Sequence, residues 1–220
     1  MADYGVSRIV ARDAVKVLAT EGLVAKRQGS GTYVRALSPP ERRIVGDFYA
    51  VRPTSSPFAR AARAAGQDPE WEYQSRSTIA PKAIAARLGI SPGDPIMKTN
   101  YRFFADGVPV MLSTSYEPLA ITGGTPIEQP EAGPLTGVIP RMDSIERVIT
   151  RLSETVTARA PRPYEGDALD IPAGTPVLAV ERTYYATDET AVETADIIVS
   201  ADRYTLVYHV PIPLRDSVVE

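Results

Sequence analysis

Basic side chains that could contact phosphate groups are concentrated at the beginning of the chain. Residues 1–35 carry six basic and three acidic side chains, whereas all 220 residues carry 24 basic and 27 acidic ones. Arg8, Arg12 and Lys16 recur at every fourth position, so on a helix they share one face. A basic segment joined to an acidic remainder is typical of a phosphate-contacting module. Chance scatter over so short a window explains the charges equally well.

A helix over residues 7–21 would place these charges on one face. The Ser7 hydroxyl can cap its first turn, and Gly22 can end it. Residues 25–34, which have glycines at their centre, predict two short strands in a hairpin. The first segment is therefore predicted to be a helix followed by a β-wing. The apolar residues that recur at helical spacing, and would pack, are Ala11, Ala14, Val15 and Leu18.

The composition changes after the predicted wing. Four prolines among several serines predict an interdomain linker without regular structure over residues 36–60. Farther along, residues 81–90 predict a helix, and apolar runs predict hairpin-linked strands. This larger part is predicted to be α+β with an antiparallel sheet. The clearest strand-like runs are residues 95–104, 108–117, 176–185 and 191–200.

A weak internal repeat relates two parts of the sheet-forming region. Residues 88–96 match residues 169–177, with leucine, isoleucine, glycine and proline at a constant offset. Each copy predicts a short helix, a turn and a strand, followed by a polar turn and a second strand. Two such units in one sheet would allow a cleft where they meet. A coincidence of common turn residues is the alternative explanation.

Composition excludes several kinds of site. The chain has no cysteine and one histidine, His209, so thiolate and multi-histidine metal sites are excluded. Neither a phosphate-cradling GxxxxGK motif nor a GxSxG nucleophile elbow occurs. No apolar run approaches the roughly 20 residues of a membrane-spanning helix. We therefore expect a cytoplasmic protein that has no metal or other cofactor and no membrane partner.

Ordered motifs resemble one family of bacterial regulators over nearly the whole chain. Residues 4–34 contain GVSR, EGLV and RQGSGT, and resemble the recognition helix and wing of the GntR family. Residues 61–213 resemble the UTRA domain of its HutC branch through LGISPGDPI, ADGVPV, STSYEP and VYHVPIP, among other motifs. The resemblance implies a partial winged helix-turn-helix over residues 1–35, a linker over 36–60 and a chorismate lyase-like UTRA effector-binding domain over 61–215.

The winged helix of the resembled family begins with about two further helices. In this sequence, the apolar stripe of the predicted helix over residues 7–21 lacks those packing partners. A misassigned start, a fragment and a natural variant that does not hold DNA by itself are three open explanations.

The resemblance also implies contacts with operator DNA. A helix fits the major groove, where arginine can donate two hydrogen bonds to guanine, and glycines let a wing approach the backbone closely. Solvent-exposed charges without a role in binding are the alternative. The implied DNA-binding residues are Ser7, Arg8, Arg12, Lys26, Arg27 and Gly29.

In the UTRA-like part, the resemblance implies a pocket for a small polar or anionic effector. Arginine suits carboxylate or phosphate groups, and glutamate accepts from hydroxyl or amine groups. Structural roles are the alternative for each residue; Arg159, for example, could pair with Glu154 or Glu165. The implied effector-binding residues are Arg102, Ser115, Tyr116, Arg159, Glu193 and Tyr204.

The function that follows is a homodimeric transcriptional repressor whose operator binding responds to an effector in the UTRA domain. It is not expected to be an enzyme. Two alternatives stay open. One is a chorismate lyase-like enzyme acting on a small acidic metabolite, and the other is a ligand-binding dimerisation module that does not bind DNA itself.

Overall fold

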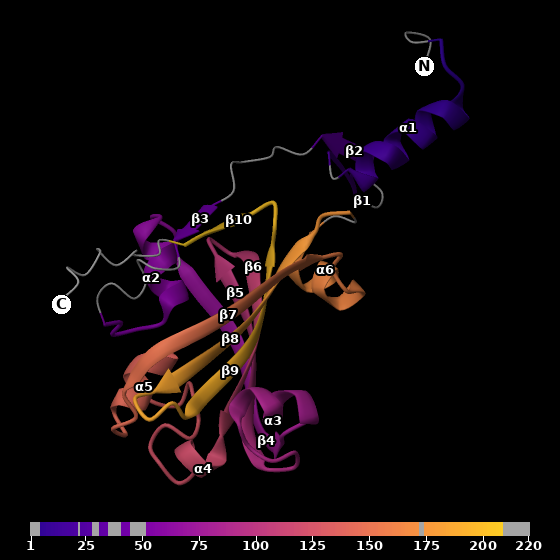
Figure 1. The fold of residues 1–220 in the computed structure, drawn as a ribbon. Helices are drawn as coiled ribbons and strands as arrows, with labels where there is room; N and C mark the ends of the chain where they lie inside the picture. Colours follow the sequence, from indigo (N-terminus) through magenta and orange to yellow (C-terminus); the bar gives the residue numbers. More distant parts are fainter. Residues whose placement is uncertain are drawn as a thin grey trace, which may run out of the picture.

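The computed structural model describes residues 5–21, 23–27, 31–34, 41–44, 52–171 and 174–208. Gly29 and His209 lie outside these residues. Figure 1 shows a small helix-and-hairpin unit at the amino-terminal end, next to a larger body built around one twisted sheet. No helix among the described residues is long and apolar enough to span a membrane.

The amino-terminal unit confirms the predicted helix and hairpin. Helix α1 (Arg8–Thr20) begins after Ser7, whose side-chain oxygen accepts a hydrogen bond from the Val10 amide at 3.3 Å. Strands β1 (Val24–Arg27) and β2 (Gly31–Val34) pair antiparallel. None of the α1 side chains is buried, and Ile9 is 73% exposed. The apolar stripe expected to pack therefore has no covering element among the described residues.

The segment predicted to be an irregular linker contains regular structure. Strand β3 (Glu41–Ile44) pairs in parallel with β10 (Tyr204–Val207), which lies near the end of the described chain. Helix α2 (Pro57–Ala64) begins before residue 60 with a proline in its first turn. The expectation of irregular structure was wrong here, because proline is tolerated at helix starts and β10 offers a free edge for pairing.

The larger body is organised around a six-stranded antiparallel sheet in the order β4-β5-β6-β9-β8-β7. The four predicted strands and the helix over residues 81–90 are confirmed. The strands are β4 (Pro69–Ile79), β5 (Pro95–Ala105), β6 (Val108–Pro118), β7 (Ile149–Arg159), β8 (Val177–Ala186) and β9 (Ala191–Ser200). The remaining helices are α3 (Lys82–Leu88), α4 (Leu119–Thr122), α5 (Val138–Asp143) and α6 (Pro163–Leu169).

The internal repeat is visible in the topology. The elements β4-α3-β5-β6 and β7-α6-β8-β9 follow the same order, and the sheet joins the two units along β6 and β9. The helices also match, since α3 packs against β9 of the second unit and α6 packs against β6 of the first. Each unit is preceded by one more helix, α2 or α5.

The two faces of the sheet have different covers. Phe58 of α2 packs against Phe103, Met111 and Ile197 on one face, where Ile139 and Met142 of α5 also contribute to the core. Helices α3 and α6 cover parts of the opposite face. Burying apolar side chains on both faces removes them from water, which is the main driving force for forming such layers.

Candidate functional site

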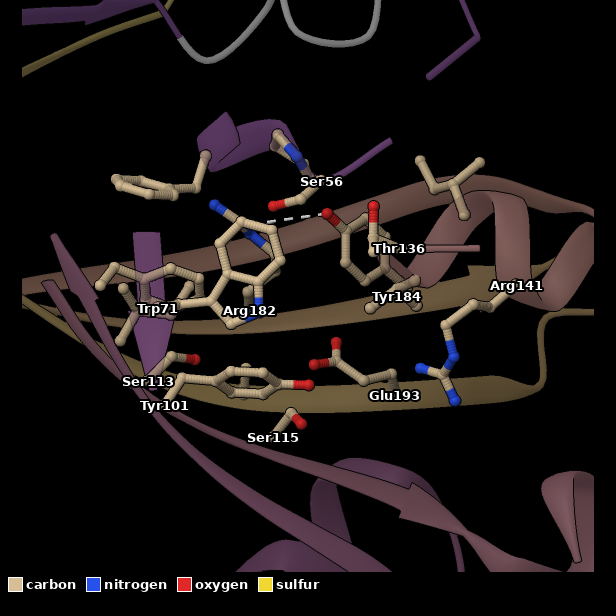
Figure 2. A pocket seen from close by; sticks show the side chains of 18 of the residues that line it. Ser56, Trp71, Tyr101, Ser113, Ser115, Thr136, Arg141, Arg182, Tyr184 and Glu193 are labelled. Atoms are coloured by element: carbon tan, nitrogen blue, oxygen red, sulfur yellow. Dashed lines mark hydrogen bonds between the residues drawn. The ribbon is translucent and has the colours of Figure 1, made fainter. Parts of the chain in front are cut away.

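A cavity lies between the sheet and the beginnings of α2 and α5, on the two central strands and their neighbours. Its volume is about 110 Å³. Figure 2 shows the side chains of strands and helices converging on it. The cavity occupies the place where the two repeat units meet, as the sequence predicted for a cleft. Its charged and aromatic lining includes Trp71, Tyr101, Phe103, Glu117, Glu131, Arg141, Arg182, Tyr184 and Glu193.

Aromatic rings form one wall of the cavity. The Phe58 and Phe103 ring centroids are 4.8 Å apart, and those of Trp71 and Phe103 are 6.3 Å apart. Glu131 fixes two neighbouring groups, accepting hydrogen bonds from the Trp71 indole nitrogen at 3.1 Å and the Tyr101 hydroxyl at 3.0 Å. Burial and the nearby Glu131 raise the Tyr101 pKa above its usual range, so the hydroxyl keeps its proton. This wall suits a flat apolar group.

Two arginines line the cavity, and both are paired with carboxylates. Arg141 donates to both Glu117 carboxylate oxygens at 2.7 and 2.9 Å, and to the Ile127 carbonyl at 2.6 Å. The Arg182 Nε atom donates to Glu154 at 2.6 Å. Such pairs hold buried charges in place because each charge is compensated by its partner.

Glu193 is also buried in the cavity, but it is not paired in this way. It is 3% exposed, and its Oε2 atom has no hydrogen-bond partner among the described residues. Burial, reinforced by the negative charge of Glu117, raises the Glu193 pKa to about 8. The carboxyl group is therefore largely protonated at neutral pH.

The amino-terminal ends of α2 and α5 meet over the cavity. Gly137 precedes α5 with φ of +88°, and a Cβ atom there would lie 2.9 Å from the Ser56 amide nitrogen. Only glycine adopts this backbone shape freely while approaching a neighbouring chain so closely. The backbone of the segment before α2 is thus packed directly on the segment before α5.

A second, wider groove crosses the opposite face of the sheet beside α6. Arg159 projects into it and donates to both Glu165 carboxylate oxygens at 2.6 and 2.7 Å, which is one of the two structural pairings foreseen from sequence. Arg102 donates from Nε to the Ala168 carbonyl at 2.8 Å. Both guanidinium groups therefore tie α6 to the sheet region.

The residues that the sequence assigned to the effector pocket do not converge on one site. Ser115 and Glu193 line the cavity beneath α2 and α5. Arg102, Tyr116 and Arg159 line the groove on the opposite face. Tyr204 lines neither and packs in the core beside α2. Adjacent strand residues point to opposite faces, so Ser115 and Tyr116 are necessarily separated.

Sequence reasoning missed most of the polar cavity lining. Side chains alternate between the two faces of a strand, and this alternation could have predicted part of the polar lining. Ser113 and Glu117 lie two positions on either side of Ser115, on the same face of β6. Arg141 and Arg182 carry no such signal, because their roles depend on distant partners.

The predicted DNA-binding residues that the structure describes lie at the start of α1, within α1 or in β1. The side chains of Arg8 and Arg12 are exposed, and the hydroxyl of Ser7 caps α1. Lys16 is paired with Asp13 at 3.0 Å. Lys26 and Arg27 belong to β1. Arg8 and Arg12 are accessible to a nucleic-acid partner.

No cluster of histidine and acidic side chains suited to a metal ion occurs in the described part of the chain. A helix-and-wing unit joined to an α+β domain with an internal cavity is the architecture of a bacterial transcriptional regulator.

Comparisons with known proteins agree with this class. The UTRA domain family matches residues 64–205, and the gntR family of bacterial regulatory proteins matches residues 1–34. The chain therefore belongs to the GntR family, in the HutC-like branch that carries a UTRA domain, and is a DNA-binding transcriptional regulator.

Individual relatives support the same assignment. The HTH-type transcriptional repressor NagR of Bacillus subtilis is 28% identical over 207 residues, which cover 94% of this chain and 80% of NagR. A crystal structure of a GntR-family transcriptional regulator is 43% identical, with a TM-score of 0.75, and the match covers 96% of this chain and 85% of that one. PhnF from Mycobacterium smegmatis, at 23% identity and a TM-score of 0.67 over 96% of this chain and 88% of PhnF, shares the fold.

Proposed function

We propose that this regulator is a cytoplasmic homodimer that represses transcription and changes its affinity for operator DNA when a small molecule occupies the cavity between its two repeat units. The observation that carries the proposal is the position of residues 53–58. Pro53, Ser55 and Ser56 line the cavity, and they belong to the segment that connects the hairpin with the sheet-bearing body.

The connection gives ligand binding a direct route to the DNA-binding unit. A ligand between the sheet and α2 would contact this segment, and β3 in the same segment pairs with β10. A ligand shifts an equilibrium only if it binds two conformations with different affinity. The connecting segment forms part of the cavity wall, so the ligand should bind with different affinity when this segment moves. Ligand binding would then favour one position of the segment, and of the DNA-binding unit attached to it.

Repression and an unreacted ligand are the further parts of the proposal. NagR is named a transcriptional repressor, which favours the same sign of regulation here. An enzyme needs a nucleophile or a matched acid and base near the substrate. In the described lining, Arg141 and Arg182 are paired with carboxylates, and Glu131 holds Trp71 and Tyr101. These contacts favour binding over catalysis.

The experiment that tests the proposal measures DNA binding with and without small molecules. A labelled duplex from the region upstream of the chain's own gene is titrated by fluorescence anisotropy, with and without a deproteinised extract of the source cells. We expect the extract to change the DNA dissociation constant, and its active compound to be recovered unchanged. Identical titrations would contradict effector control, and consumption of the compound would favour the enzyme.

A further inference from the structure

The unpaired carboxyl group of Glu193 has a defined position inside the cavity. Figure 2 shows it pointing into the space beside Tyr101 and Ser115, away from its own strand. The Tyr101 hydroxyl donates to Glu131, and therefore does not satisfy Glu193. Burying a carboxyl oxygen without a partner costs free energy unless a bound molecule supplies the missing donor. The structure thus has a place for a donor that the described residues do not fill.

The charged groups around Glu193 indicate whether the ligand group that donates to it is cationic or anionic. The Arg141 and Arg182 guanidinium groups are paired with Glu117 and Glu154, respectively. An anionic ligand would have to compete with those carboxylates for the arginines, and it would meet a further carboxyl group at Glu193. A cationic ligand would instead compensate Glu193, whose Oε2 atom has no partner among the described residues. The other cavity carboxylate without a printed cationic partner, Glu131, already accepts hydrogen bonds from Trp71 and Tyr101.

We propose that the ligand of the cavity carries a positively charged amine that binds Glu193, attached to a ring-sized apolar body that packs on Trp71 and Phe103. The inference rests on the proposed function only in treating this cavity as the effector site. The family resemblance implied a small polar or anionic effector; the pairing of the two arginines favours a cationic one instead.

Binding of such an amine displaces a proton. Burial and Glu117 on β6 raise the Glu193 pKa to about 8, while Arg182 on β8, Arg141 on α5 and Arg87 on α3 oppose the rise. The empty site therefore holds Glu193 protonated at neutral pH. On binding the ammonium group, the carboxylic acid gives its proton to water and a carboxylate–ammonium pair forms. Affinity should rise about tenfold per pH unit up to about pH 8 and then level off.

The test uses three probes that share one ring: benzylamine, benzyl alcohol and benzyl phosphate. The only tryptophan, Trp71, lines the cavity, so its fluorescence reports occupancy directly. We expect benzylamine to bind most tightly, with an affinity that rises with pH. Calorimetry in two buffers of different ionisation enthalpy should show the release of one proton. Tightest binding by benzyl phosphate, or pH-independent binding of benzylamine, would overturn the inference.

Two variants separate a ligand contact from a structural effect. Glu193→Gln keeps the side-chain shape and should still bind benzyl alcohol, but it should lose the preference for benzylamine and the proton release. Glu70→Gln changes an exposed glutamate on β4 and should leave all three affinities unchanged. A preference for benzylamine that survives Glu193→Gln would show that the amine binds elsewhere and would overturn the inference.

A parallel measurement of operator binding distinguishes failure of this inference from failure of the proposed function. If benzylamine binds through Glu193 while operator affinity does not respond to any extract, the amine site stands and effector control is contradicted. If the extract changes operator affinity but its active compound is an anion, effector control stands and the amine site is overturned.

Discussion

Glu193 makes folding stability depend on pH in a direction opposite to that of most carboxylates. The pKa of Glu193 is about 8 in the folded protein and about 4.5 in the unfolded chain. Between about pH 4.5 and pH 8, the folded state therefore binds more protons than the unfolded state. The free energy of unfolding should therefore fall as pH rises from about 4.5 to about 8. Above that range the contribution is constant.

Replacing Glu193 with glutamine removes this titration. We expect Glu193→Gln to be more stable than the native chain by more than about 1 kcal/mol at pH 8, with the difference shrinking toward pH 5. Urea denaturation at several pH values measures it, with Glu70→Gln as the exposed control. Parallel pH curves for Glu193→Gln and the native chain would show that Glu193 is ionised in the folded protein.

At the scale of elements, the contact between the beginnings of α2 and α5 forms one border of the cavity. Gly137→Ala would bring a methyl group against the Ser56 backbone at a positive φ. We expect it to lower the free energy of unfolding by about 1–3 kcal/mol. Gly133→Ala is the matched control, because its Cβ would meet no atom within 4 Å and its φ is not positive. Equal stabilities of the two variants would mean that the helix beginnings are not tightly packed.

Helix α1 presents the arginines expected to contact DNA. Arg12→Ala should weaken specific binding by about 1–3 kcal/mol if Arg12 contacts a base, and should weaken binding to all sequences equally if it contacts phosphate. Competition anisotropy with operator and unrelated duplexes distinguishes the two outcomes. Arg76→Ala, an exposed arginine on β4, is the control. Unchanged binding to both duplexes would remove Arg12 from the interface.

Local patterns in the sequence were sufficient to predict most elements. Ser7 identified the beginning of α1, and the repeat identified two equivalent helix-and-hairpin units that the structure confirms. The β3–β10 pairing was missed because parallel pairing of distant segments has no local signature.

The cavity was harder to predict than the fold. The sequence placed Glu193 and Ser115 in a pocket, but it grouped them with Arg102 and Arg159 on the opposite face. Strand alternation separates neighbours in sequence, and an arginine that binds a ligand looks the same as one that pairs with Glu165. Which arginine is already paired depends on tertiary contacts that one sequence does not reveal.

For the whole molecule, the proposal requires two DNA-binding units in one assembly. Operators of such regulators are read as paired half-sites, so we expect a homodimer formed through the sheet-bearing body. Sedimentation velocity at micromolar concentration should give twice the 23.8 kDa mass of the chain. Deleting residues 1–35 should leave the dimer intact. A monomer both with and without DNA would contradict this assembly.

The central claim is that occupancy of the cavity and binding of DNA are coupled, and Trp71 allows the coupling to be measured from the ligand side. Trp71 is the only tryptophan and lines the cavity. The compound purified from the extract by its binding to the protein is titrated against Trp71 fluorescence, without DNA and with saturating operator duplex. Because coupling between two binding sites is reciprocal, DNA should change the ligand dissociation constant by the factor by which ligand changes that of DNA, about 5- to 150-fold. Identical ligand titrations with and without DNA would contradict control of DNA binding from this cavity.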